Sequence, residues 1–277
     1  LPFAKMQTCG NDYIFLEDFD GEITCPESLC VTLCDRHYGI GADGIILMER
    51  SRKADARMRM FNADGSEGSM AGNALRCMAK YLYDNHIVRK EEMTIETDKG
   101  TKTVRVYTTD GKVTSACVDM GYAALDTTAL HLNIPERRVV DYPVEIGGQS
   151  WNITCVDMGN PHCVVFCPRV DGVDVGRIGP QFEHASYFPD RINTEFIRVV
   201  NPSTIKMRVW ERGSGETMAC GTGACAAVVA AVAAGQCEQG RDITVRVRGG
   251  DLVVNYTDEA VTLTGDAKLV YTGTVEY

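Results

Sequence analysis

The chain has 277 residues, of which 44% are hydrophobic and 24% charged, a balance typical of an ordinary globular protein. Its net charge of −10 and pI of about 5.0 disfavour binding to nucleic acid, because the phosphates would be repelled. The first residues lack a basic stretch followed by an apolar core, so we expect no signal peptide and a cytoplasmic location. The longest apolar run, 224–234, is too short to span a bilayer, so no membrane association is expected.

The first half of the chain is predicted to contain one helix and a strand pair. Residues 74–85 place their apolar side chains at helical spacing, which predicts an amphipathic helix. Residues 94–97 and 103–107 alternate in polarity as strands do, and the turn-forming stretch 98–100 lies between them.

The same order of elements returns in the second half. Residues 223–234 are apolar all round, which predicts a buried helix, and Gly235 is a natural stop for it. Strands are expected at 243–247 and 252–254. Each half of the chain is thus expected to contain many strands and few helices, which indicates an α+β fold.

Four blocks of the second half match blocks of the first half at one constant offset of 149 residues. They pair 10–15 with 159–164, 44–47 with 193–196, 61–67 with 210–216, and 71–73 with 220–222. Identity within each block is modest, but a single offset without adjustment indicates an internal duplication. We therefore predict two similar domains, namely 1–125 joined by the C-terminal strand or strands near 266–277, and 126–265.

The twelve cysteines are expected to be reduced thiols. No C-x-x-C occurs, and the two C-x3-C clusters, at 30–34 and 163–167, have no partner pair at zinc-site spacing. This pattern argues against a structural metal and against a thiol redox protein, so no metal site is predicted.

Both predicted helices begin just after a duplicated glycine, at Gly72–Asn73 and at Gly221–Thr222. The free N–H groups of a helix start suit a carboxylate. Cys220 immediately precedes the second start, a position that should lower the pKa of its thiol and make it reactive. The alternative interpretation is a buried, inert cysteine before a turn.

Several polar residues of the repeated blocks are further candidates. His162 is the one histidine within those blocks, and it has either a site role or a structural one. Arg212, next to Glu211, could bind a carboxylate or form a surface ion pair. Four asparagines are turn residues taken singly, but as a set they could bind ammonium and carboxylate groups: Asn11, Asn62, Asn160 and Asn193. No phosphate-binding loop and no pyridoxal-phosphate lysine motif is found.

The motifs around these residues resemble those of the diaminopimelate epimerases, which belong to the cofactor-independent amino-acid racemases and epimerases. The resemblance runs over nearly the whole chain, through Lys5-Met6 and the stretches 10–13, 35–44, 61–67, 70–77, 159–162, 191–196 and 211–225.

This resemblance implies an isomerase that needs no cofactor and interconverts L,L- and meso-diaminopimelate through two thiols, in lysine and peptidoglycan precursor synthesis. It also implies two similar α/β domains with the active site in the cleft between them, and a homodimer. By this resemblance, the two helix starts (Gly72, Asn73, Gly221, Thr222) would bind the α-carboxylate of the substrate, and Glu211 would accept a hydrogen bond from its ammonium group. The distal carboxylate would be bound by Arg212, Asn160 and Asn193. Asn11 and Asn62 would complete the pocket, and His162 would tune the thiols.

One departure from the family pattern concerns chemistry. Where the family has its first catalytic cysteine, this chain has Ala71, whose methyl group cannot exchange a proton. We favour a cysteine replaced by alanine in an inactivated enzyme, because the other motifs are intact. The alternatives are a natural homologue with one-base chemistry, a non-catalytic amino-acid binding protein, or a racemase for another amino acid such as histidine.

Overall fold

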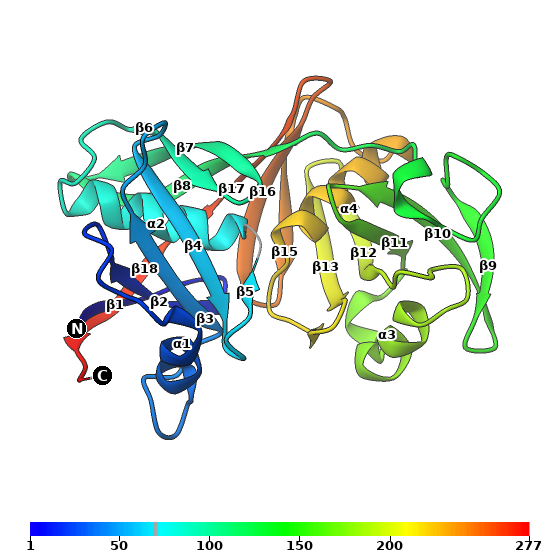
Figure 1. Cartoon of the computed structure of the whole chain (residues 1–277). Coiled ribbons are helices and arrows are strands. Elements are labelled where there is room, and N and C mark those ends of the chain that lie inside the picture. The colour runs from blue at the N-terminus through cyan, green and yellow to red at the C-terminus, as the bar shows by residue number, and fades with distance from the viewer. Residues whose placement is uncertain (69–70, 277) are drawn as a thin grey trace. The chain divides into compact units, whose positions relative to one another are not determined.

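The computed structural model describes residues 1–68 and 71–276, and the chain divides into two units (Figure 1). Unit 1 comprises Leu1–Asp119 and Thr264–Tyr277, and unit 2 comprises Met120–Leu263. Among the described residues, no helix is both long enough and apolar enough to cross a membrane.

Unit 1 is a mixed sheet with two helices. Its neighbouring strands are, in order, β18 (Lys268–Thr274), β1 (Pro2–Thr8), β2 (Asn11–Glu17), β3 (Gly44–Glu49), β4 (Ala56–Asn62), β6 (Glu92–Thr97), β7 (Gly100–Thr109) and β8 (Lys112–Gly121), with the short β5 (Glu67–Gly68) beside β4. The pairs β2–β3 and β4–β6 are parallel and the other pairs are antiparallel. The helices are α1 (Pro26–Cys34) and α2 (Gly72–Asp84).

Unit 2 repeats this pattern. Its strands follow the order β9 (Tyr142–Ile146), β10 (Gln149–Asp157), β11 (Pro161–Phe166), β12 (Asn193–Asn201), β13 (Thr204–Glu211), β15 (Asp242–Val247) and β16 (Gly250–Tyr256), with β14 (Gly215–Glu216) beside β13. Here β11–β12 and β13–β15 are the parallel pairs. The helices are α3 (Val175–Glu183) and α4 (Gly221–Ala233), with short 3-10 turns at Thr128–Leu130 and Val170–Gly172, and β17 (Val261–Asp266) runs across the boundary of the units.

The registers of the two units match residue by residue. Tyr13 pairs with Gly44 in unit 1, and His162 pairs with Asn193 in unit 2, each exactly at the offset of 149 read from the sequence. The helices α2 and α4 begin and end at the same offset. The predicted internal duplication and the α+β fold are therefore confirmed.

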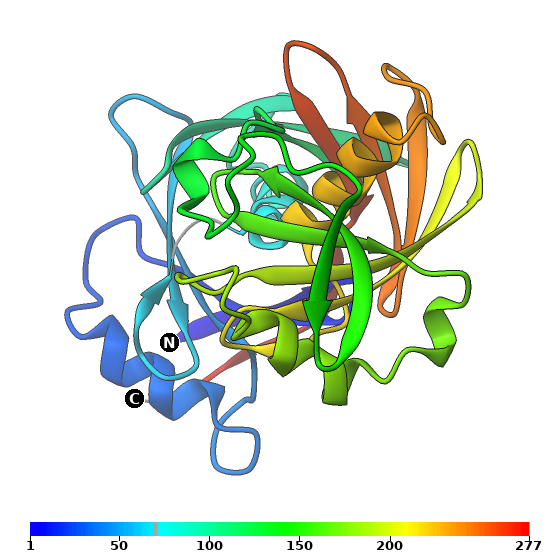
Figure 2. The same ribbon diagram turned by 90° about the vertical axis from the view of Figure 1, so that its right-hand side faces the viewer.

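The two duplicated helices are buried because of their composition. In α2 the residues predicted to share one face, among them Leu75, Met78 and Leu82, are fully buried. Helix α4 is apolar all round. It packs against strands that precede it in the chain, β10 to β13, and against strands that follow it, β15 and β16 (Figure 2). It ends before Gly235, whose φ of +71° suits glycine. The predicted helices and strand pairs are thus confirmed, with ends that differ by at most three residues. The prediction of one helix in each half missed α1 and α3.

The twelve cysteines all lie within the described residues and are free thiols. Most of them are buried, and Cys30 and Cys34 lie on successive turns of α1 with their sulfur atoms 3.6 Å apart. Within residues 1–68 and 71–276, no group of three or more His, Cys, Asp or Glu side chains is arranged to hold a metal ion.

Candidate active site

The starts of α2 and α4 are the duplicated features on which the site is built. The residue before α2 is Ala71, whose side chain makes no capping hydrogen bond, and the residue before α4 is Cys220. The sulfur of Cys220 accepts a hydrogen bond from the amide of Gly223, at 3.4 Å. Both helix starts therefore lie where the sequence predicts them, and one of them carries a thiol.

An asparagine side chain is hydrogen-bonded to each helix start, with the helix residue as donor in unit 1 and as acceptor in unit 2. In unit 1, Asn73 Nδ2 donates to Asn11 Oδ1 at 3.2 Å. In unit 2, Asn160 Nδ2 donates to Thr222 Oγ1 at 3.3 Å. Both partners of one pair stand 149 positions from those of the other. The duplication thus preserves a polar contact as well as a backbone shape.

Cys220 lies next to an acidic partner in unit 2. Cys220 is only 7% exposed, and the charge of Glu211, at the end of β13, acts on its thiol. Thr222 Oγ1 lies 3.6 Å from the sulfur, and Thr217 Oγ1 donates a short hydrogen bond to Glu211. This arrangement can pass a proton between the sulfur and the carboxylate.

The pKa of Cys220 is raised, and the prediction that the helix start lowers it is wrong. Burial contributes most to the rise, followed by the charges of Glu211 and Glu195. The hydrogen bonds from Thr222 and from the Gly223 amide act in the opposite direction but are outweighed. The pKa of Glu211 is also raised, first by burial and then by the charge of Glu195. In the protein without ligand, Cys220 is therefore a thiol at neutral pH.

His162 lies fully buried on β11 between two oxygen atoms. Its Nδ1 is 2.7 Å from Glu195 Oε1, and its Nε2 is 3.0 Å from Asn160 Oδ1. The structure thus joins His162 and Asn160 to the start of α4. Sequence reasoning missed Glu195 as a site residue. The one available signal was its pairing with apolar Ile46 inside a repeated block.

Asn193 and Arg212 are brought together at the start of β12. Asn193 Oδ1 accepts from the Arg212 amide at 2.9 Å, and Asn193 Nδ2 donates to the Pro161 carbonyl at 2.8 Å. Asn193 thus ties together the ends of three segments. The exposed guanidinium of Arg212 donates to the Asp190 carbonyl at 3.1 Å and forms no ion pair with any described residue. The alternative interpretation of Arg212 as part of a surface ion pair is therefore wrong.

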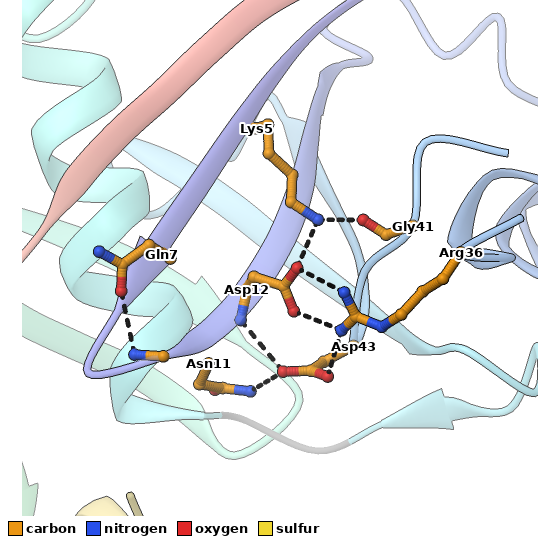
Figure 3. A network of polar contacts seen from close by, with 8 residues as sticks. Lys5, Gln7, Asn11, Asp12, Arg36, Gly41 and Asp43 are labelled. Carbon is orange, nitrogen blue, oxygen red and sulfur yellow. Dashed lines mark hydrogen bonds and ion pairs between the residues drawn. The ribbon is translucent and has the colours of Figure 1, made fainter. Parts of the chain in front are cut away.

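A charged network holds the candidate residue Asn11 in unit 1 (Figure 3). Asp43 accepts a hydrogen bond from Asn11 Nδ2 at 2.7 Å. Arg36 bridges Asp43, at 3.1 Å, and Asp12, at 2.8 Å, and Lys5 Nζ lies 2.5 Å from Asp12. The network orients the side-chain amide of Asn11 so that its oxygen accepts the hydrogen bond from Asn73.

Asn62 lies at the end of β4, where its side chain donates to Ser66 Oγ at 3.0 Å within the following turn. The contacts described for Asn62 are thus those of a turn residue. Nothing in unit 1 itself assigns it a ligand.

The ion pairs of Asp12 with Lys5 and Arg36 predict how the stability of the protein depends on pH. Burial raises the pKa of Asp12, but hydrogen bonds and charge from Arg36 and Lys5 together lower it. A lowered pKa means that the stabilisation is complete above the pKa of an unfolded aspartate and is lost as the pH falls through the folded value. We expect Asp12→Asn to reduce the free energy of unfolding at pH 7 by about 2 kcal/mol. That difference should shrink below about pH 4.

Urea unfolding at pH 7 and at acidic pH measures this effect. Asp20→Asn is the control, because Asp20 and its partner Arg50 are both largely exposed and such pairs contribute little. Equal losses for the two variants at pH 7 would show that the network around Asn11 does not contribute.

Comparison with known proteins agrees with this geometry. The sequence profile of the family described as diaminopimelate epimerase matches residues 3–125 and 154–275, which covers both halves. A diaminopimelate epimerase of Desulfovibrio desulfuricans is 48% identical over 99% of this chain and 97% of its own length. One of Acetivibrio thermocellus is 45% identical over 99% and 98%.

The chain belongs to the diaminopimelate epimerase family. A hydroxyproline epimerase of Agrobacterium vitis shares the fold, with a TM-score of 0.68 at 13% identity over 98% of this chain and 91% of its own. Two repeated domains of the diaminopimelate epimerase type therefore explain the internal duplication.

Ala71 stands at the helix start where the resemblance leads us to expect a cysteine. Its backbone is extended, with φ −115° and ψ 123°, and Cys220 has nearly the same values, −126° and 116°. Met70, which precedes Ala71 in the family motif, lies outside the described residues. The backbone before α2 thus matches the backbone before α4, and the side chain of residue 71 is a methyl group without an acid–base function.

Proposed function

We propose that the chain has the site of a diaminopimelate epimerase without the second catalytic thiol. It binds diaminopimelate and moves the α-hydrogen at one face only, through Cys220. The observation that carries this proposal is that buried Cys220 lies beside the half-buried carboxylate of Glu211 at the start of α4, in a chain whose two halves both match the family.

The proposed proton transfer begins at the thiol. Cys220 passes its proton to Glu211, and the thiolate then takes the α-hydrogen, so that a C–H bond breaks and an S–H bond forms. The electron pair left on carbon is delocalised into the α-carboxylate, which the free amides of a helix start can stabilise. The ammonium group of the substrate favours the thiolate, because a nearby positive charge lowers the pKa of a thiol.

Inversion needs a second acid on the opposite face of the carbon. Ala71 cannot supply that proton, so the carbanion is reprotonated on the same face by Cys220, after the proton on its sulfur has exchanged with solvent. The expected outcome is exchange of the α-hydrogen with solvent and no change of configuration. The alternative, a homologue that only binds its amino acid, predicts neither exchange nor inversion.

Recognition of the distal end separates diaminopimelate from other amino acids. Arg212 has an exposed guanidinium without an ion-pair partner among the described residues, and Asn160 and Asn193 lie at the neighbouring strand starts. A guanidinium suits a second carboxylate, and an imidazole such as that of histidine carries none.

Calorimetry with this chain tests the proposal. L,L- and meso-diaminopimelate are expected to bind, and L-lysine and L-histidine, which lack the second carboxylate, to bind at least about tenfold more weakly. Arg212→Gln should remove most of that preference. Equal binding of all four amino acids, or binding of histidine alone, would contradict the assignment of substrate.

Two further expectations concern the state of the protein. Leu269, Val270 and Tyr271 are exposed large apolar side chains next to one another on β18, which supports the homodimer expected for the family. Sedimentation equilibrium should then give twice the chain mass of 30.3 kDa, and a single-chain mass would contradict it. The twelve free thiols favour a reducing compartment such as the cytoplasm.

A further inference from the structure

Glu195 is a buried acidic residue that takes no part in the proton transfer proposed above. It lies on β12 with no exposed surface, and its Oε1 is 2.7 Å from His162 Nδ1. Its Oε2 is buried and has no hydrogen-bond partner among the described residues. A buried carboxylate oxygen without a partner costs stability, so such a group is seldom kept for packing alone.

The first turn of α4 lies directly against this carboxylate. A side-chain carbon added at Gly223 would lie 2.6 Å from Glu195 Oε1, so only glycine fits there without displacement. The amide of the same glycine donates to the sulfur of Cys220. Glu195 and Cys220 therefore both adjoin Gly223 in the first turn of α4.

A chain of contacts connects the carboxylate to the thiol. It runs from Glu195 to His162 at 2.7 Å and from His162 to Asn160 at 3.0 Å. It continues from Asn160 to Thr222 at 3.3 Å, and Thr222 Oγ1 lies 3.6 Å from the sulfur of Cys220. The orientation of each side chain in this series depends on the one before it.

Unit 1 offers an internal comparison. At the offset of 149, Glu195 corresponds to Ile46 and His162 to Tyr13, and both of these are buried. The asparagine contact at the helix start is present in both units, whereas Tyr13 and Ile46 stand in unit 1 at the positions of the acid–histidine pair beside Cys220. Packing of the duplicated fold therefore does not require this pair.

We propose that Glu195 is a positioning residue for the Cys220 site: its carboxylate fixes the imidazole of His162, which in turn holds the amide of Asn160 against Thr222. The proposal rests on the proposed function only in taking Cys220 as the reacting thiol. Glu195 also acts on the Cys220 site through its charge, which raises the pKa values of both Cys220 and Glu211. The titratable or charged groups that bear on Cys220 are then Glu211 from β13, Glu195 from β12 and His162 from β11.

Glu195→Gln tests the proposal in the chain as it exists, without any need for turnover. The first readout is the pH dependence of Cys220 alkylation by iodoacetamide, followed by mass spectrometry of the Cys220 peptide so that the other thiols do not interfere. Loss of the charge should move the midpoint to lower pH by about one unit. The second readout is the ring-nitrogen NMR signal of His162 in protein labelled with 15N-histidine, which should shift because Nδ1 loses its carboxylate partner.

Thr194→Val is the matched control, because Thr194 is the buried neighbour on β12 whose hydroxyl has no partner among the described residues. Its side chain points to the opposite face of the strand. It should leave both readouts unchanged. Gly223→Ala is the second test variant, since its methyl group would displace the carboxylate, and it should shift the His162 signal while Glu195 is still present.

Unchanged alkylation and NMR readouts in folded Glu195→Gln would overturn the proposal. If that variant does not fold, an unchanged His162 signal in Gly223→Ala would do so. Failure of diaminopimelate to bind or to exchange its α-hydrogen would contradict the proposed function instead. The two failures are distinguishable because neither readout here uses the substrate.

Discussion

Ala71→Cys is expected to give the chain epimerase turnover, with L,L-diaminopimelate converted to the meso isomer. The physical reason is that a second thiol supplies the acid for the opposite face, where the methyl group of Ala71 has no proton to give. The backbone is already suitable, because Ala71 and Cys220 precede their helices with nearly equal φ and ψ. A positioned acid–base group contributes about 10²–10⁴-fold to a rate, so a gain of at least that size is expected.

Chiral chromatography of the product measures this gain. Ala71→Ser is the matched control, because a hydroxyl is close to a thiol in size but is far too weak an acid at neutral pH. It should remain inactive in epimerisation while binding the substrate. A folded Ala71→Cys variant that binds diaminopimelate and yet forms no meso isomer would contradict the two-thiol assignment.

Cys220→Ser is expected to abolish exchange of the α-hydrogen in the chain as it stands. In D2O the unsubstituted chain should replace the α-proton of bound diaminopimelate with deuterium and keep its configuration, because Cys220 acts on one face. Removing the base should slow this exchange by about 10²–10⁴-fold. Since burial, Glu211 and Glu195 raise the pKa of Cys220, the exchange rate should also increase as the pH rises above neutrality.

Loss of the α-proton signal in the NMR spectrum follows the exchange. Cys225→Ala is the control, because Cys225 is a buried thiol of the same helix, one turn further from the helix start. It should exchange as the unsubstituted chain does. Equal exchange rates in Cys220→Ser and Cys225→Ala would assign the base to another residue, and Glu211 would then be the first candidate.

Local sequence patterns correctly predicted one helix and one strand pair in each half, and missed α1 and α3. Helices α2 and α4 follow from side-chain periodicity and from the glycines at their ends, which act within one or two turns. The duplication was visible because a constant offset of 149 needs no knowledge of the fold. The same offset relates the Asn11–Asn73 contact to the Asn160–Thr222 contact, which the structure added.

The site was predicted less completely, because its chemistry depends on residues far apart in the sequence. Glu195 and His162 are 33 positions apart and meet only because β11 and β12 pair in parallel. The resemblance to the diaminopimelate epimerases placed Asn193 and Arg212 in one set, but their contact arises where β12 begins beside the end of β13. No spacing rule within one segment could have shown either contact.

The sequence by itself determined the two similar halves, the two helix starts and the thiol at position 220. These features are local or repeated, so composition and spacing suffice to find them. Only the tertiary structure decided the protonation of Cys220. A helix start alone would lower the pKa of that thiol, but burial and two carboxylates from neighbouring strands raise it. The sign of that shift is set by the sum of all groups around the sulfur, and folding is what brings them there.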